Sequence, residues 1–350
     1  MYLPYTRPIS SPYYHLLPSL FKRFSIASAV RTAVPTLGYY LRRPAIAAGS
    51  KPALFSMNIL PPMMTVWHHC VRKYLGDAVD VTVFDCSGRL DASALQGFRV
   101  QKFLNLYAST KCDEFIRSIA RNRTIAWLCD DDIFFISDRS LPILEREFQD
   151  PNTASVSFRP RGWWEFDLNG KKMEASGSYC VAINREIFWK KEHLSLAPAD
   201  HNPHTTLSGS IRRYDTFDKA NEILLIKGYR CPVIPKQERD ACITGFSGIS
   251  GAVMMLWHFR KPEDILDYYR GPDKKAWEGN VLPGTLCALL AICTIQECYE
   301  KITGKKYPLP SLPSRAELEK VLKEKRLYMR SDVQIFEEMK EASAKLKDAL

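Results

Sequence analysis

Residues 124–137 read TIAWLCDDDIFFIS, a strand-like apolar run that enters three adjacent aspartates and then becomes apolar again. Three neighbouring carboxylates repel one another unless a cation or strong hydrogen-bond donors lie between them. Hard cations such as Mg²⁺ or Mn²⁺ prefer oxygen ligands and bind through one or two carboxylates plus a substrate phosphate. We therefore expect a divalent cation beside Asp130, Asp131 and Asp132. Taken alone, the same triplet also fits a solvated acidic turn.

The residues before this stretch predict alternating strands and helices. Strands are expected at 52–60 (PALFSMNIL), 79–88 (VDVTVFDCSG) and 124–129, and helices at 64–76, 93–109 and 112–122. This alternation predicts a mostly parallel α/β sheet, in which ligands bind beyond the carboxyl ends of the strands. Asn58, Asp85 and the three aspartates fall at such ends. On an extended segment, Asp130 and Asp132 would face the same side.

The second half of the chain shows first strand-like and then helical patterns. Residues 150–191 alternate strand-like runs with turn signals such as Asn169-Gly170, which predicts an antiparallel extension of the sheet. A helix with apolar residues at Phe217, Ala220 and Leu224 is expected to stop at Gly228. Residues 262–350 are mostly helical in pattern. We therefore divide the chain into an arm at 1–51, a catalytic α/β domain at 52–262 and a helical extension at 263–350.

The positive charge of the chain is concentrated at its start. The formal net charge is +10, yet residues 1–76 hold nine Lys or Arg and no Asp or Glu, so the remainder is near neutral. The segment lacks the long apolar stretch of a spanning helix or a secretory signal. Three interpretations stay open: a loosely packed basic arm, an element that lies on a membrane surface, or an organelle transit peptide. No nucleic-acid recognition motif accompanies it.

Ten cysteines are spread along the chain without a CxxC pair. Several lie inside apolar runs, where a free cysteine behaves as a small buried hydrophobic residue. This usage predicts a reducing, cytoplasmic compartment, with attachment to the surface of a membrane through the basic arm as one option.

Several motifs together resemble glycosyltransferases of the GT-A fold, in particular the family 2-like enzymes. IAWLCDDDIFF resembles their strand and DxD motif, VTVFDCSG their second strand, and EASGSYCVAINREIF the glycine-containing segment beside the donor sugar. RRYDTFDKANEILLIKGYR resembles the acidic motif that supplies the catalytic base, and MLWHFR the segment with a C-terminal histidine. The resemblance covers residues 52–262, in the order that this fold uses.

The resemblance implies a role for each matched residue. Asn58, Asp85, Asp130, Asp131 and Gly177 would bind a nucleotide-sugar donor, such as a UDP- or GDP-sugar. Asp130, Asp132 and His258 would hold Mn²⁺ or Mg²⁺. Asp215 or Asp218 would be the base; the family has Glu before Asp where this chain has Tyr214-Asp215, so the choice between them stays open. Trp163 and Trp164 are either core residues or a platform for an acceptor sugar.

The sequence thus predicts a metal-dependent glycosyltransferase of α/β, GT-A-like fold that acts on a glycan or lipid-linked acceptor. Two alternatives remain. A nucleotidyltransferase of related fold would usually carry a Gly-rich basic loop after the first strand, and SMNILPPMM has neither Gly nor Lys or Arg. A non-catalytic scaffold that keeps the fold is the other alternative, which the presence of Asp132, Asp215 and His258 disfavours.

Overall fold

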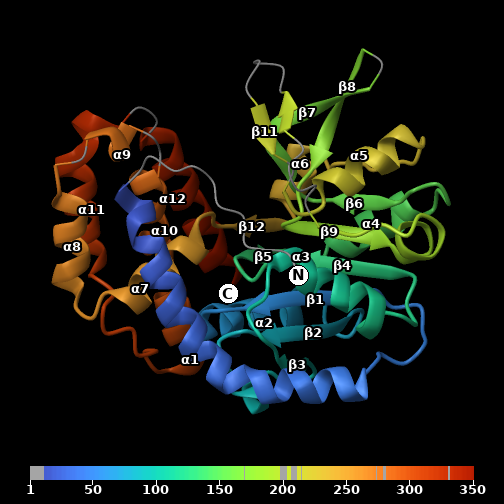
Figure 1. The fold of residues 1–350 in the computed structure, drawn as a ribbon, viewed down its shortest axis with the longest axis horizontal. Coiled ribbons are helices and arrows are strands. Elements are labelled where there is room, and N and C mark those ends of the chain that lie inside the picture. The colour runs from blue at the N-terminus through green and yellow to red at the C-terminus, as the bar shows by residue number, and fades with distance from the viewer. Residues whose placement is uncertain are drawn as a thin grey trace.

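The computed structural model describes residues 12–168, 170–197, 203–205, 211–213, 215–272, 274–278, 281–329 and 332–350. A six-stranded sheet lies at its centre, in the order β3-β2-β1-β4-β9-β6 (Figure 1). The strands of this sheet are β1 (Ala53–Asn58), β2 (Asp80–Asp85), β3 (Arg99–Lys102), β4 (Ile125–Cys129), β6 (Ser155–Ser157) and β9 (Cys180–Asn184).

The sheet is mostly parallel, as the sequence predicts. β1 pairs in parallel with β2 and β4, and β2 with β3, whereas β9 runs antiparallel between β4 and β6. β1, β2 and β4 are buried almost throughout, because helices cover both faces of a parallel sheet. Their parallel direction brings Asn58 into register with Asp85 and places both at the edge where β4 ends.

The antiparallel extension is also present. β7 (Pro160–Leu168) and β8 (Lys171–Ser176) form a hairpin whose turn includes Gly170 at φ +79°, and the hairpin projects from the body of the molecule (Figure 1). Two shorter strand pairs complete this half, with β5 (Ile133–Phe135) against β12 (Ile243–Gly245) and β10 (Pro203–Thr205) against β11 (Ile211–Arg213).

Helices cover the two faces of the sheet with separate apolar clusters. One face carries α2 (Pro61–Tyr74), whose Trp67 joins Leu54 and Trp127 of the strands. On the other face, α3 (Ala108–Glu114), η2 (Phe115–Ile119) and α5 (Asp218–Ile226) pack against Phe55 and Leu128. The remaining helices of this half are η1 (Ala92–Ala94), α4 (Ser140–Phe148), η3 (Glu186–Lys191), α6 (Lys236–Asp240) and α7 (Ile249–His258).

The helical C-terminal region packs on the α2 face and shares its apolar cluster. α10 (Val281–Thr303) contacts α2, α7 and α12 (Asp332–Ala349), and the group forms one side of the molecule (Figure 1). α8 (Pro262–Arg270), α9 (Lys274–Glu278), α11 (Arg315–Lys325) and η4 (Arg326–Tyr328) complete it. α11 begins with a capping box that Ser314 and Glu317 form. The division into domains stays a prediction.

α10 contains the one helical segment, among the described residues, that is long and apolar enough to cross a membrane. It spans Leu282–Thr303, and 78% of its apolar window is buried inside the protein. Burial by neighbouring helices identifies it as a helix of the protein core. All ten cysteines lie in the described part of the chain, and all are buried free thiols.

Two predictions about local structure are wrong. Residues 93–109, expected to be a helix, contain η1 and strand β3, because Arg99–Lys102 completes the parallel sheet beside β2. The alternation of Phe98, Val100 and the polar residues between them carried that signal. The loosely packed interpretation of the basic arm is also wrong for residues 26–42 of helix α1 (Pro12–Arg42), because Thr32 and Tyr39 are buried and Tyr39 donates a hydrogen bond to Glu114.

Candidate functional site

Polar side chains gather at the carboxyl ends of β1, β2 and β4. Asn58 is fully buried and donates from Nδ2 to the carbonyl of Leu60 at 2.9 Å and to Oδ2 of Asp131 at 3.2 Å. Asp130 follows β4 directly and donates its backbone N–H to the carbonyl of Tyr179 at 2.8 Å. The structure therefore brings Asn58 together with the aspartate triplet at one edge, as the strand order requires.

Burial raises the pKa of all three aspartates, and neighbouring carboxylates add to the rise for Asp130 and Asp131. Asp131 is 8% exposed, and burial together with the charges of Asp132 and Asp130 raises its pKa well above the usual range. Burial and the charge of Asp132 act in the same way on Asp130. Burial raises the pKa of Asp132 to about 7, although the nearby Arg159 opposes the shift. Carboxylates crowded in this way are stabilised by an added cation.

Two cations near the triplet are residues that the sequence analysis did not select. Lys111 is 4% exposed and lowers the pKa of Asp130 and Asp131; its Nζ donates to Oδ1 of Asn105 at 2.9 Å. Arg159 lowers the pKa of Asp132. The pKa values of all three aspartates stay raised despite these two cations, so the protein's own charges offset the repulsion only in part.

The chemistry of the acid edge fits a hard divalent ion. Asp130 and Asp132 are partly exposed, and their carboxylate oxygens are the ligand type that Mg²⁺ and Mn²⁺ prefer. No group of three or more His, Cys, Asp or Glu side chains within the described residues is arranged to hold a metal ion. His258 lies at the end of α7 with its ring 4.9 Å from that of Phe259. The arrangement suits an ion that two carboxylates and a ligand phosphate share.

The carboxylate of Asp85 is hydrogen-bonded within the loop that follows β2. Its Oδ1 accepts from Ser87 N, Ser87 Oγ and Gly88 N at 2.6 to 3.0 Å, and its Oδ2 accepts from Leu90 N at 3.1 Å. The side chain is fully buried. Asp85 therefore shapes the loop after β2, and any contact with a ligand would come from the loop that it holds in place.

Gly177 lies where no side chain fits. Its N–H donates to the carbonyl of Arg159 at 2.7 Å, and an added Cβ would lie 2.8 Å from that same oxygen and 3.1 Å from the carbonyl of Pro160. The glycine allows the end of β8 to approach the start of β7. This close approach sets the position of the adjacent Tyr179.

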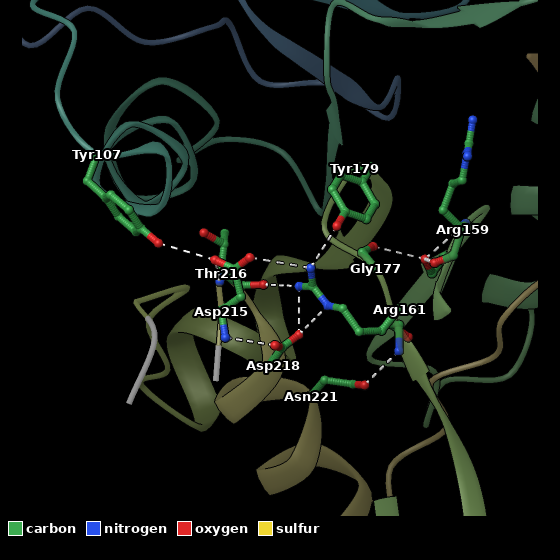
Figure 2. Close-up of polar contacts among 11 residues, drawn as sticks. Tyr107, Arg159, Arg161, Gly177, Tyr179, Asp215, Thr216, Asp218 and Asn221 are labelled. Atoms are coloured by element: carbon green, nitrogen blue, oxygen red, sulfur yellow. Dashed lines mark hydrogen bonds and ion pairs between the residues drawn. The ribbon is translucent and has the colours of Figure 1, made fainter. Parts of the chain in front are cut away.

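A buried arginine organises the second acidic group (Figure 2). The side chain of Arg161 is fully buried, and its Nε and Nη2 reach Oδ1 of Asp218 at 2.7 and 2.6 Å. Nη2 also donates to the carbonyl of Thr216 at 2.7 Å, and Nη1 donates to Tyr179 Oη at 3.1 Å. Burial raises the pKa of Asp218 to about 6, and Arg161 opposes that rise. Asp218 is thus held inside the protein by a forked ion pair.

Asp215 lies on the open side of the same group. Its side chain is 49% exposed, whereas that of Asp218 is 2% exposed. Oδ1 of Asp215 accepts from Tyr107 Oη at 3.2 Å, and its Oδ2 lies 3.7 Å from Nη1 of Arg161. Burial and the charge of Asp215 raise the pKa of Tyr107 to about 12, so the phenol stays a hydrogen-bond donor.

The turn between the two acids is strained. Phe217 is buried and has a φ of +74°, a left-handed conformation that costs on the order of 1–3 kcal/mol for a residue with a side chain. The backbone N–H of Asp215 donates to Oδ2 of Asp218 at 2.7 Å, which ties the turn together. Asp218 is the first residue of α5.

Tyr179 connects the two acidic groups. Its carbonyl accepts from the backbone of Asp130, and its hydroxyl accepts from Arg161, which pairs with Asp218 and lies beside Asp215. Consistent with this proximity, the charges of Asp215 and Arg161 both act on the pKa of Asp130. The two groups therefore face a common region of the molecule.

Sequence reasoning missed the residues that bind these groups together. A pair of arginines two positions apart in RPRG, at the start of a strand, was the available signal for Arg159 and Arg161. Trp163 and Trp164 lie on β7, and their side chains are outside the described residues.

Comparison with known proteins leaves the family of the chain open. No family model matches, and no curated protein matches. One solved structure that the chain is similar to is the mannosyltransferase PcManGT from Pyrobaculum calidifontis in complex with GDP-Man and Mn²⁺. The two chains are 13% identical with a TM-score of 0.38, and the alignment covers 94% of this chain and 97% of the other. A similarity this low supports no conclusion about the function of this chain.

Proposed function

We propose that this chain is a metal-dependent glycosyltransferase of the GT-A type, which moves a sugar from a nucleotide-sugar donor to an acceptor hydroxyl. The observation that carries the proposal is the pairing of two unlike acidic groups across Tyr179. One group is the cluster of carboxylates at the sheet edge, where Asp132 raises the pKa of Asp130. The other group is the half-exposed Asp215 beside the buried ion pair of Asp218 and Arg161, and Tyr179 contacts both groups. Sugar transfer from a nucleotide diphosphate needs both a cation site and a proton acceptor.

The donor would lie along the ends of β1, β2 and β4. Asp130 and Asp132 would hold the Mn²⁺ or Mg²⁺ ion, with His258 a further candidate ligand, and Asp131 would stay bonded to Asn58. The loop that Asp85 shapes would receive the nucleotide, and the sugar would lie beside Tyr179, near the close approach of β7 and β8 that Gly177 allows. The divalent ion supplies electrostatic stabilisation of the diphosphate as negative charge develops on it.

Asp215 is the better of the two candidates for the base. Asp215 is exposed enough to meet an acceptor. Asp218 is instead buried, and it accepts hydrogen bonds from Nε and Nη2 of Arg161. In an inverting transfer, Asp215 takes the proton of the acceptor hydroxyl while the acceptor oxygen bonds to the anomeric carbon. The bond from that carbon to the diphosphate oxygen breaks, and the electron pair leaves with the diphosphate.

The acceptor is proposed to be a glycan or a lipid-linked sugar, and the donor a UDP- or GDP-sugar. Trp163 and Trp164, on the same strand β7 as Arg161, are proposed to form an aromatic platform for the acceptor.

A scan of nucleotide sugars tests the proposal. The full chain is incubated with UDP- and GDP-sugars, with Mn²⁺, Mg²⁺ or EDTA, and release of nucleoside diphosphate is followed. We expect release with at least one donor, and its loss in EDTA. Release of pyrophosphate from nucleoside triphosphate and sugar phosphate would instead identify a nucleotidyltransferase. Donor binding without turnover on any acceptor would identify a non-catalytic protein and overturn the proposal.

A further inference from the structure

The N-terminal helix α1 buries a polar face and exposes an apolar one. Its buried face carries Ser28, Thr32 and Thr36, while large apolar side chains cover the opposite face. An ordinary surface helix buries its apolar face and exposes its polar one. The exposed stripe consists of Ile26, Val30, Val34, Leu37 and Leu41, with exposed fractions of 62–79%.

The buried face is specifically bound, so the orientation of the helix is fixed. Thr36 Oγ1 donates to the carbonyl of Thr32 and accepts from the backbone of Leu104, at 2.7 and 2.8 Å. Tyr39 is 1% exposed and donates to Glu114 at 2.8 Å. Arg31 donates from Nε to the carbonyl of Ser87 at 2.9 Å. Rotating the helix to bury its apolar stripe would break the contacts with Leu104, Glu114 and Ser87, which come from other parts of the protein.

The stripe is continuous and lies on the outside of the molecule. Its members follow one another at spacings of four, four, three and four residues, which keeps them on one face of a helix. From Ile26 to Leu41 the stripe is about 22 Å long at 1.5 Å per residue. Figure 1 shows α1 running along the outer surface past α7 to the edge strand β3. Isolated exposed apolar residues are common, but a stripe of five on one helix marks an interaction surface.

The charge around the stripe identifies its partner. No acidic residue occurs before Asp77, and Arg42 and Arg43 are exposed directly after Leu41. The sequence places Lys22 and Arg23 one turn before Ile26. Packing two copies of this stripe against each other would bring basic residues close to basic residues. An apolar face flanked by basic residues matches an anionic lipid surface instead, with apolar side chains in the headgroup boundary and cations beside the phosphates.

We infer that α1 docks the protein on an anionic membrane surface through the stripe Ile26, Val30, Val34, Leu37 and Leu41. Tyr39 does not belong to this stripe, because it is part of the protein core. The inference goes beyond the proposed transferase and does not depend on it. Through Arg31 and Ser87, the docked helix contacts the loop that Asp85 shapes, so the proposed donor site would lie next to the membrane.

Vesicle flotation with the full chain tests the inference without any substrate. The probes are vesicles of phosphatidylcholine with 30% phosphatidylserine and vesicles of phosphatidylcholine alone. We expect binding to the anionic vesicles, weaker binding at 0.5 M NaCl, and at least a tenfold lower partition coefficient for Leu37→Gln/Leu41→Gln. Glutamine keeps helix propensity close to that of leucine, so the helix should persist. Val30→Gln/Val34→Gln should have the same effect.

Leu327→Gln is the matched control, because Leu327 is 93% exposed but lies on η4, far from α1 in sequence. It should bind vesicles like the unchanged protein. The inference fails if the unchanged protein does not float, if the α1 variants bind equally well, or if Leu327→Gln loses as much binding. A vesicle-free dimer that the α1 variants dissociate would identify the stripe as a subunit interface and also overturn the membrane assignment.

Discussion

The acidic triplet at the end of β4 and the acidic pair around α5 differ in how their charge is neutralised. Arg161, a fully buried guanidinium, grips Asp218 and lies beside Asp215, so the second group carries its counter-charge within the protein. Lys111 and Arg159 lower pKa values in the triplet, and Arg161 lowers that of Asp130, yet the pKa values of all three aspartates remain raised. An added cation would therefore stabilise the triplet further, whereas the pair around α5 already has a counter-charge inside the protein and leaves the carboxylate of Asp215 exposed.

Removing the exposed member of the second group should have the largest effect. We expect Asp215→Asn to lower the turnover number about 10²–10⁴-fold while leaving donor affinity nearly unchanged, because a lost proton acceptor acts only in the transition state. Turnover and calorimetric donor binding are measured on the same protein sample. Asp267→Asn, with a side chain that is 77% exposed on α8, is the control and should be fully active. Equal turnover in both variants would move the base elsewhere or favour a retaining mechanism.

Removing Arg161, the buried partner of Asp218, should mainly lower the stability of the protein. Arg161→Met leaves Asp218 buried without its partner, which should reduce the free energy of unfolding by about 3–5 kcal/mol in urea titrations. Arg146→Met is the control; Arg146 is 51% exposed and pairs with Glu147 and Glu238, so a loss of at most about 1 kcal/mol is expected.

The same reasoning predicts a rescue. Arg161→Met/Asp218→Leu removes both charges, and such replacements of buried ion pairs are often neutral. A double variant as unstable as Arg161→Met would show that the hydrogen bonds from Arg161 to Thr216 and Tyr179, rather than the ion pair, hold the turn together.

Removing the external cation should have the smallest of the three effects. Calorimetric binding of a nucleoside diphosphate should weaken at least about tenfold, or about 1.4 kcal/mol, in EDTA and in Asp132→Ala. Asp138→Ala is the control, because Asp138 is an exposed aspartate shortly after β5. Undiminished binding in EDTA would remove the distinction between the two acidic groups, since the triplet would then need no cation.

Local sequence patterns were sufficient for the parts of the fold that depend on near neighbours. Apolar runs ending in Asn58, Asp85 and Asp130 predicted the parallel strands and the edge where they end. The stop of α5 at Gly228, with φ +80°, followed from the glycine alone. In contrast, Arg99–Lys102 carries only a short alternation around Val100, and it is β3 because it pairs with the edge of β2.

The sequence by itself determined the order of the strands and helices along the chain, the acids that follow the strands, and the basic character of the N-terminal segment. These are consequences of residue type and of periods of two to four residues, which act locally. Only the tertiary structure decided that the carboxylate of Asp85 is hydrogen-bonded within its own loop and that Arg161 pairs with Asp218, 57 positions away. It also decided which face of α1 is buried. Such partners are distant in sequence, and no local pattern encodes the packing that brings them together.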